Sequence, residues 1–573
     1  MRERMSDRND QIELATLVVG VTGHRKLREA EIPALQAQVR DFLVELQRRY
    51  PGLPVVLLSS LAEGGDQLAA QVALELGLRV IAPLPLPVEL YRHDFDDASR
   101  AVLDRQLQQV ETLVLPLRHD SHHEAIAQPG LARDQQYAQA GIFVSSHCHI
   151  LLALWDGRDS EKLGGTAQVV RFHLQGSVPG QIDRRRRVAL ARLGLDEETL
   201  VYHLQANREH DTEGVSVPGR WLTADEDIVA HDLLPPAFDV MFQHQAEFNA
   251  DVRKYSPAIL EQFVLESAHD PDPAPCPIES LFVATDWMAR TYQRRVGHVL
   301  RIVYLLAAAM GFAFFTYTHI SAHSVVINLF LVFFLAGMGV VMLARRREWQ
   351  RKHLDYRALA EGLRVQSYWR RAGIVDLNSP AFAHDSFLQK QDVELGWIRN
   401  VMRGASLDGL RMPAQAGPSQ VEAVIRDWIG TPDSGGQLRY FSTTSARRAR
   451  QHHRAEMLGL ACLWAGIAIS VLLAIFARRL GTHEQHLLVS TMGILSVAAA
   501  VHEAYAYKKA DKELIKQYRF MQRIFGAARR RLTGCNDLAE KRQVLRTLGE
   551  AALAEHAEWT LMHRERRLEH SRL

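Results

Sequence analysis

The chain has 573 residues, which is too long for one hydrophobic core and predicts two or three structural units. Its 68 Lys and Arg residues nearly balance 66 Asp and Glu residues, so the net charge of +2 does not favour nucleic acid as a partner. Four cysteines lie far apart without a C-x-x-C spacing, which fits neither a zinc site nor a disulfide framework. We therefore expect a reducing compartment, no metal and no cofactor.

The first residues are polar and lack the apolar core of a signal peptide, so the N-terminal domain is predicted to stay in the cytoplasm. Apolar runs then alternate with helical patterns, which is typical of a parallel sheet covered on both faces. The fold predicted for this region is an α/β Rossmann-like doubly wound parallel sheet. Strands are expected within 14–23, 54–61, 78–86, 112–117, 148–157 and 199–206, and helices over 29–50, 65–77, 97–110, 131–146 and 165–175.

Unusual residues follow three of these strands, at the edge where doubly wound sheets bind ligands. Glycines after a strand let the backbone approach a ligand, Arg25 can pair with phosphate, and a helix start favours an anion. Each glycine pair is also compatible with ordinary turn chemistry, Asp66 with a helix-start residue, and Glu63 with a solvated side chain. The candidate ligand-binding residues are Gly20, Thr22, Gly23, His24, Arg25, Glu63, Gly64, Gly65, Asp66, Asp156, Gly157, Gly164, Gly165 and Thr166.

The C-terminal half contains four apolar segments, 299–317, 325–344, 457–477 and 487–505, each long enough to cross a bilayer. They predict an all-α membrane region with four transmembrane helices in two hairpins. Arginines and lysines flank the outer ends of both hairpins, whereas only Arg478 and Arg479 lie in a turn between spans. The positive-inside rule therefore predicts a multi-pass protein of the cell inner membrane, with the N-terminal domain and the C-terminus in the cytoplasm.

Several polar residues lie inside the predicted spans and could mark a conduction path. They are Arg301, Thr316, Asn328, Ser470, Ser490, Thr491 and Ser496. The alternative is helix-to-helix hydrogen bonding, with close packing at Gly337, Gly339 and Gly493.

The sequence divides into a nucleotide-binding domain (1–210), a helical connector (211–290) and a first transmembrane hairpin with a helical extension (291–404). A linker (405–445) and a second hairpin with C-terminal helices (446–573) follow. Two minor signals stand outside this scheme. The basic run 184–187 is typical of a solvated loop, with anionic lipid or the ligand as alternative contacts. His119, His122 and His123 fit a surface loop better than a metal site.

The segments VTGHR, SSLAEGGDQLAAQVALELG, LLALWDG and GGTAQVV resemble the SLOG superfamily, which includes DNA-processing protein A and the Lonely-guy phosphoribohydrolases. This resemblance covers about the first 205 residues. The membrane half, with HLDYRALAEGLRVQSYWRRAGI and EHAEWTLMHRERRLE, looks like the SLATT effector domains that accompany SLOG domains. The resemblance implies a sensor of a nucleotide-derived signal joined to a membrane module that forms a pore in bacterial antiviral defence.

The chain differs at one position from the hydrolases that it resembles, and this difference bears on catalysis. Lonely-guy enzymes carry a glutamate just after their glycine-threonine turn, whereas this chain continues with Ala167 and Gln168. Binding of a cyclic or NAD-derived nucleotide without turnover is therefore expected, with no catalytic residue. The expected partners are this ligand, the bilayer and further copies of the chain, because a ligand at a protomer interface could supply the roughly 5.5 kcal/mol that drives an oligomeric switch.

Two alternatives remain. A membrane-tethered hydrolase of nucleotide or NAD-type substrates would use Glu63 or Asp156 as its acid or base. Binding of single-stranded DNA, as in the DNA-processing relatives, would need a basic groove with interleaved aromatic residues, which the N-terminal domain lacks.

Overall fold

The computed structural model describes residues 12–118, 122–160, 162–178, 182–183, 199–209, 217–224, 228–267, 276–319, 323–375, 387–388, 393–410, 417–476, 478–509 and 511–565. The chain forms two compact units. The first contains Met1–Thr285 and Ala358–Gln415, and the second contains Asp286–Arg357 and Ala416–Leu573. Helices α11 (Pro277–His319) and α13 (Trp349–Arg371) each contribute residues to both units.

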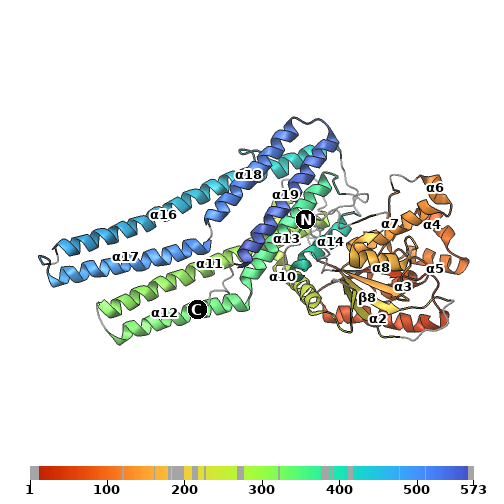
Figure 1. Cartoon of the computed structure of the whole chain (residues 1–573), viewed down its shortest axis with the longest axis horizontal. Helices are drawn as coiled ribbons and strands as arrows, with labels where there is room; N and C mark the ends of the chain where they lie inside the picture. Colours follow the sequence, from red (N-terminus) through yellow and green to blue (C-terminus); the bar gives the residue numbers. More distant parts are fainter. Residues whose placement is uncertain are drawn as a thin grey trace. The chain divides into compact units, whose positions relative to one another are not determined.

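The first unit, which carries the labels α2 to α8 and β8 in Figure 1, is built on an eight-stranded sheet. The strand order is β10-β9-β8-β5-β1-β2-β3-β4. All six predicted strands are present and pair in parallel, which confirms the doubly wound α/β class. They are β1 (Leu17–Gly23), β2 (Val55–Leu58), β3 (Arg79–Leu84), β4 (Glu111–Val114), β5 (Ile150–Trp155) and β8 (Leu200–Gln205).

Helices cover both faces of this sheet. On one face lie α2 (Ile32–Arg49) and α3 (Gly65–Glu75), where Phe42 of α2 stacks on Tyr202 of β8 with ring centroids 4.2 Å apart. On the other face α7 (Leu131–His147) and α8 (Thr166–Gln175) pack over apolar residues that point to that side. Shorter elements complete the connections: η1 (Glu29–Glu31), α4 (Val88–Tyr91), η2 (Arg92–Asp94), α5 (Asp97–Leu107) and α6 (His123–Ala127).

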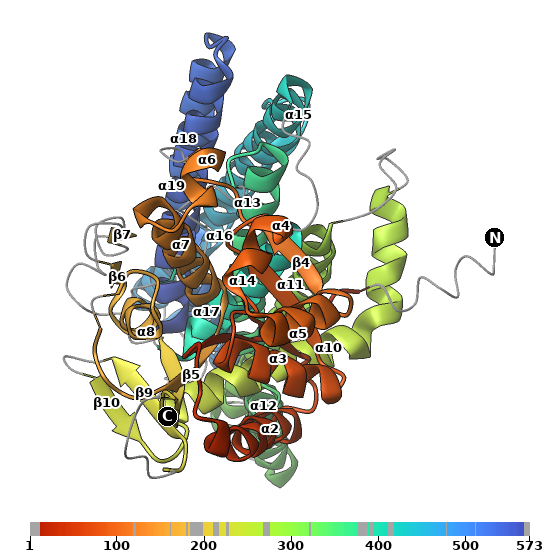
Figure 2. The same ribbon diagram turned by 90° about the vertical axis from the view of Figure 1, so that its right-hand side faces the viewer.

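The segment 211–290, for which we expected a helical connector, also contains two strands. Antiparallel β9 (Arg220–Ala224) and β10 (Ile228–His231) extend the sheet beyond β8, and α10 (Pro236–Ser267) follows them (Figure 2). The strands are too short for a clear alternation, and every residue of β10 is exposed or half-buried. A further two-residue pair joins β6 (Ser177–Val178) to β7 (Ile182–Asp183). The predicted basic run 184–187 lies outside the described residues.

Helix α14 (Gly396–Leu410) belongs to the sheet unit, although it lies in a segment that we assigned to the first membrane hairpin and its linker. It covers the amino ends of the strands. Nε2 of His149, at the start of β5, lies 2.9 Å from the carbonyl oxygen of Asn400, and Arg79 of β3 forms an ion pair of 2.6 Å with Asp408. At the same edge, Asn249 of α10 exchanges two hydrogen bonds with the backbone of Ala15.

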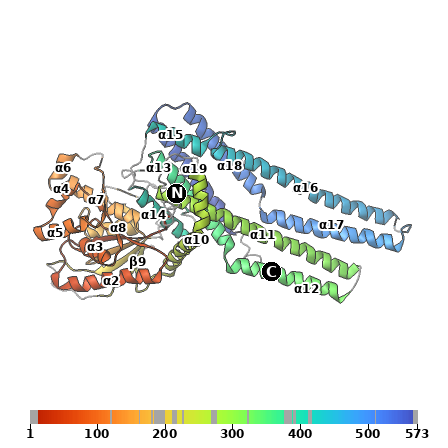
Figure 3. The same ribbon diagram turned by 180° about the vertical axis from the view of Figure 1, so that it is seen from behind.

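The second unit contains four helices that are long and apolar enough to cross a membrane, which confirms the predicted number of spans. They are α11 (Pro277–His319), α12 (Ser324–Arg346), α16 (Gly436–Phe476) and α17 (Thr482–Lys509). Figure 3 shows them as two hairpins, α11 with α12 and α16 with α17. Their apolar side chains point outward, with Leu305 70% exposed and Trp464 61% exposed. Such a surface is compatible with a multi-pass membrane protein.

The two hairpins pack through α11 and α17. A Cβ atom on Gly493 would lie 2.2 Å from the ring of Phe315, so this glycine permits the close approach that the packing interpretation predicts. Gly339 has no neighbour within 4 Å of such an atom, so it has no packing role within the unit. The hydroxyls of Thr316, Ser470, Thr491 and Ser496 each donate to a carbonyl one turn earlier in their own helix. These four bonds lie within single helices and are not the helix-to-helix hydrogen bonds of the packing interpretation; of these hydroxyls, Ser470 also contacts another helix, at 3.0 Å from Sδ of Met492.

Outside the spans, the second unit is helical throughout its longer described segments. The segment 405–445, which we expected to be a linker, includes α15 (Pro418–Val424), the π-helix η6 (Ile425–Ile429) and the start of α16. Helices α18 (Asp511–Thr533) and α19 (Leu538–Glu565) follow the last span. Buried Asp355 of α13 lies 3.6 Å from buried Arg564 of α19, and His353 contacts Trp559 edge-on at 6.4 Å. These contacts join α13 to α19.

Candidate functional site

The sheet topology determines where a ligand site is expected. From β1 the chain continues to β2, β3 and β4 on one side and later returns to β5 on the other, so the strand order reverses between β1 and β5. Doubly wound sheets bind ligands beyond the carboxyl ends of the strands at this reversal. The residues that directly follow β1 and β5 are His24 and Asp156. The three predicted loops follow β5, β1 and β2, which are neighbours in the sheet.

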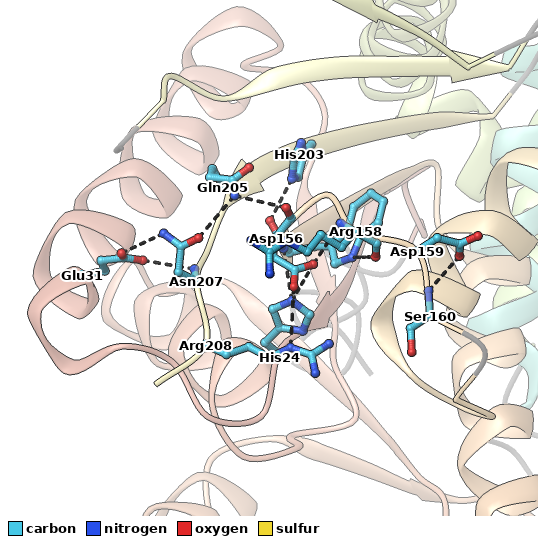
Figure 4. Close-up of polar contacts among 11 residues, drawn as sticks. His24, Glu31, Asp156, Arg158, Asp159, Ser160, His203, Gln205, Asn207 and Arg208 are labelled. Atoms are coloured by element: carbon cyan, nitrogen blue, oxygen red, sulfur yellow. Dashed lines mark hydrogen bonds and ion pairs between the residues drawn. The ribbon is translucent and has the colours of Figure 1, made fainter. Parts of the chain in front are cut away.

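His24 and Asp156 form a buried pair across the reversal (Figure 4). Nε2 of His24 lies 3.1 Å from both Oδ1 and the backbone N of Asp156, so it donates to the carboxylate when it carries a proton and accepts from the backbone N–H when it does not. The two side chains are only 5% and 6% exposed. Oδ1 of Asp156 also accepts from the Arg158 N–H at 3.0 Å, and Oδ2 lies 3.7 Å from Arg208. The carboxylate is thus occupied by protein groups, and its role is to join the two loops.

The segment after β8 closes the other side of this pair (Figure 4). Asn207 donates its side-chain amide to Glu31 at 2.8 Å, and Gln205 donates to the Asp156 carbonyl at 3.2 Å. The backbone of 206–209 also bonds to the loop after β1, as in the 3.1 Å contact from the Arg28 N–H to the Asn207 carbonyl. This segment fixes the loop that carries Arg25.

The glycines of the first two loops serve contacts within the protein. Gly20 lies inside β1, where a Cβ atom would come within 2.8 Å of Cys148 and Val144. Gly23 and Gly65 touch through their backbones, and a Cβ atom on Gly64 (φ +88°) would lie 2.0 Å from the carbonyl oxygen of Arg25. These four positions therefore require glycine so that strand, loop and helix can meet, whether or not a ligand binds there. Thr22 is buried at the end of the same strand.

Asp66 and Glu63 differ in their surroundings. Asp66 is 5% exposed and its carboxylate accepts hydrogen bonds from the backbone of Gly23 and Ala62, yet burial raises its pKa to about 7. The Gly65 N–H donates to the His24 carbonyl at 3.0 Å. Protein groups therefore already occupy the start of α3. Glu63 is half-buried, and burial followed by the charge of Asp96 raises its pKa.

Arg25 is an exposed cation of the site, as are the neighbouring Lys26 and Arg208. Its guanidinium lies 5.0 Å from the ring centroid of Tyr137, on α7. Within the described part of the chain, Arg25 forms no ion pair, so its charge is available to an anion. The nearby phenols of Tyr137 and Tyr91 raise its pKa in spite of burial. Arg25 is therefore a permanent positive charge beside an aromatic ring.

Tyr137 connects Arg25 to the start of α8. A Cβ atom on Gly164 (φ +72°) would lie 3.0 Å from Cβ of Tyr137, so the turn that contains Gly164, Gly165 and Thr166 packs against the tyrosine. The first N–H groups of a helix have no partner inside it, and they attract anions. Tyr137 thus contacts Arg25 through its ring and the turn before α8 through its Cβ. Gly157 (φ +78°) forms the exposed turn after β5.

Four residues of this network were not predicted from the sequence: Tyr91, Asp94, Arg133 and Tyr137. The Tyr137 hydroxyl donates to the Asp94 carboxylate, which Arg133 also contacts at 2.8 Å. Tyr91 donates to the Ser60 carbonyl at 3.0 Å. These side chains come from helices and not from strand ends. The four-residue spacing of Arg133 and Tyr137 on one predicted helix was the only signal for them.

The described residues contain no group of three or more His, Cys, Asp or Glu that could hold a metal ion. His119 lies outside the described residues, and His122 and His123 begin α6. Comparison with protein-family models finds no match for the chain, and no curated protein matches it.

Proposed function

We propose that the protein is a membrane-anchored sensor and effector that binds a nucleotide-derived signal, cyclic or NAD-derived, at the carboxyl edge of the sheet. Binding shifts the protomers toward an oligomer whose spans permeabilise or gate the inner membrane, as part of bacterial antiviral defence. The resemblance to SLOG and SLATT domains is the source of the defence role and of the signal class. The cytoplasmic placement of both chain ends is part of the same proposal.

The observation that carries the proposal is the position of Arg25. It combines an exposed guanidinium without an ion pair, a neighbouring aromatic ring and the first turn of α8. Phosphate is recognised by Arg forks and helix starts, and a base can stack on an aromatic face. Four candidate membrane helices in the same chain support an effector role.

A tethered hydrolase is the second candidate, and one observation favours it. Burial raises the pKa of Glu63, which is the direction that a general acid requires, and the residue lies in the loop after β2. Asp156 is a poorer candidate because His24 and Arg158 occupy its Oδ1. Glu63→Gln should abolish turnover under the hydrolase hypothesis, whereas under the sensor hypothesis neither the variant nor the unmodified protein consumes the nucleotide.

The decisive test uses the full-length protein in proteoliposomes that contain a fluorescent dye. Cyclic nucleotides and NAD-derived nucleotides are added one at a time, and each is analysed afterwards by mass spectrometry. Dye release with an unaltered nucleotide supports the sensor, whereas a consumed nucleotide without release supports the hydrolase.

Arg25→Ala should weaken binding of the active nucleotide by about 10- to 100-fold, because a charge-assisted contact is lost. The matched control is Arg40→Ala, which removes a surface arginine on α2 that pairs with Glu75. Equal affinities of the Arg25→Ala protein and the unmodified protein would show that the site lies elsewhere.

A further inference from the structure

Two twenty-residue segments of the second unit, 436–455 and 514–533, contain eleven Lys or Arg residues and no Asp or Glu. The first segment is the start of α16 and the second is most of α18. We refer to this helix pair as the stem. The net charge of the whole chain is only +2, so this local excess of positive charge is not visible in the overall composition.

The stem is an antiparallel helix pair (Figure 3). At the end of the stem near the span, Lys512 forms an ion pair of 3.0 Å with Glu456. At the far end, Arg529 donates a hydrogen bond of 2.6 Å to the carbonyl of Gly430, which precedes α16. Between them, Phe441 of α16 packs against Phe525 of α18 with ring centroids 5.6 Å apart. Because the apolar face of α18 is buried in this contact, α18 has no such face with which to enter a lipid interface.

The basic side chains lie on the outside of the stem in two similar rows. Arg447, Arg450 and Arg454 on α16 are exposed, as are Lys516, Arg519 and Arg523 on α18. Both rows have spacings of three and four residues, which place each row on one side of its helix. None of the six forms an ion pair with a described residue. Their charges are therefore not neutralised within the described parts of the chain.

Most of the stem lies too far from the bilayer for lipid headgroups to neutralise it. Helix α16 is continuous from Gly436 to Phe476, and its apolar span starts at Met457. With a rise of 1.5 Å per residue, Arg447 lies about 15 Å and Arg439 about 27 Å before that point along the helix. The headgroup layer takes up about 5–7 Å of each distance. Arg439 then lies well beyond the Debye length of roughly 8 Å at physiological salt, and Arg447 lies at about that length. A soluble polyanion is thus the better partner for the outer part of the stem.

We propose that the stem binds the phosphodiester backbone of a single-stranded nucleic acid. Rows of cations with interleaved exposed aromatic rings are the pattern that binds single strands, because phosphates pair with the cations and bases stack on the rings. Tyr440 is 40% exposed and Phe520 is 47% exposed beside these rows. This partner is the opposite of what the net charge predicted, and the surface is distinct from the nucleotide site on the sheet.

The test measures binding of a fluorescein-labelled thirty-nucleotide oligothymidylate to the full-length protein in nanodiscs of zwitterionic lipid. Anisotropy is recorded across a salt series that includes about 150 mM. The stem variant carries Arg447→Gln, Arg450→Gln, Arg519→Gln and Arg523→Gln. We expect it to bind about 30-fold more weakly, with a salt slope less steep by about 3, because each lost phosphate contact removes roughly 0.7 from the slope.

The matched control removes four positive charges outside the stem, and thermal unfolding verifies that both variants fold. It should bind the oligonucleotide as the unmodified protein does. Equal losses in both variants, or no binding by the unmodified protein at about 150 mM salt, would overturn the proposal. A stem variant that keeps its oligonucleotide affinity but loses binding to anionic vesicles would assign the surface to lipid instead. The control substitutions are Arg48→Gln, Arg426→Gln, Arg478→Gln and Arg479→Gln.

Discussion

The two units of this protein place the same kind of side chain in opposite environments. Leu17, on the central strand of the sheet, is fully buried, whereas Leu305, inside the first span, is 70% exposed. The Thr316 hydroxyl bonds to its own helix, but polar groups of the sheet unit connect separate loops, as His24 and Asp156 do. The sheet unit therefore buries its apolar residues away from water, whereas the four apolar helices of the second unit expose a surface that is compatible with lipid.

The largest expected effect is an opposite response of the two units to pH. Burial raises the pKa of Asp66 from 3.8 to about 7, so the folded sheet unit holds a proton that the unfolded chain releases. This proton stabilises the sheet unit by about 4 kcal/mol below pH 4, and the stabilisation is lost as the pH rises through 7. Burial lowers the pKa of His353 from 6.5 to about 4. That stabilisation of the second unit, about 3 kcal/mol, is present above pH 6.5 and is lost as the pH falls through 4.

Hydrogen exchange of each unit across pH 4–8 measures both responses in one sample. Asp66→Asn should remove the response of the sheet unit alone, and His353→Gln that of the second unit alone. A sheet unit whose pH response is the same in the Asp66→Asn protein would contradict the assignment.

Truncation of leucine compares the two environments directly. Leu17→Ala should reduce the free energy of unfolding by about 3 kcal/mol, because it leaves a cavity beside fully buried neighbours. Leu305→Ala removes the same atoms from an outward-facing position, so its effect should stay below about 0.5 kcal/mol. Denaturant unfolding in detergent measures both variants, and equal losses would mean that Leu305 is buried in the assembled protein.

Gly64→Ala examines the contact between the first two loops. A Cβ atom at this position would strike the Arg25 carbonyl at 2.0 Å, whereas Gly77, which also has a positive φ, has no neighbour within 4 Å. We expect Gly64→Ala to destabilise the sheet unit by about 2 kcal/mol more than Gly77→Ala, since both share the backbone strain and only one has the clash. Thermal unfolding compares them, and indistinguishable midpoints would exclude the clash.

Gly493→Ala should have a smaller effect than Gly64→Ala, about 1 kcal/mol, through the contact of α17 with Phe315. Gly339→Ala is the control, because it gains the same helix propensity while its added Cβ atom has no neighbour within 4 Å. The difference between their thermal midpoints in nanodiscs therefore reports the packing between the two hairpins. A Gly493→Ala protein as stable as the Gly339→Ala protein would show that α11 and α17 separate in a bilayer.

Local sequence patterns predicted the parallel strands and the membrane spans, because each of these depends on a short stretch of residues. The apolar runs that end at Gly23 and Trp155 located the central strands, and the four long apolar segments located the spans. Patterns could not show that Gly23 and Gly64 are needed for contacts between loops, because those contacts depend on the packed neighbours. Tyr137 was missed because its one signal, the four-residue spacing from Arg133 on a predicted helix, also occurs on many helices that form no site. The bond between His149 and Asn400 joins residues 251 positions apart, beyond the reach of any local pattern.

That distant contact has a consequence for synthesis. The sheet unit consists of two stretches of chain, and the second, Ala358–Gln415, emerges from the ribosome only after the whole first hairpin has been made. The amino ends of β1 and β5 therefore lack their α14 cover while α11 and α12 are being inserted. A nascent chain stalled before residue 396 should contact a chaperone or insertase, and this contact should be lost once α14 has been released. Completion of the sheet unit would then depend on integration of the first hairpin into the membrane.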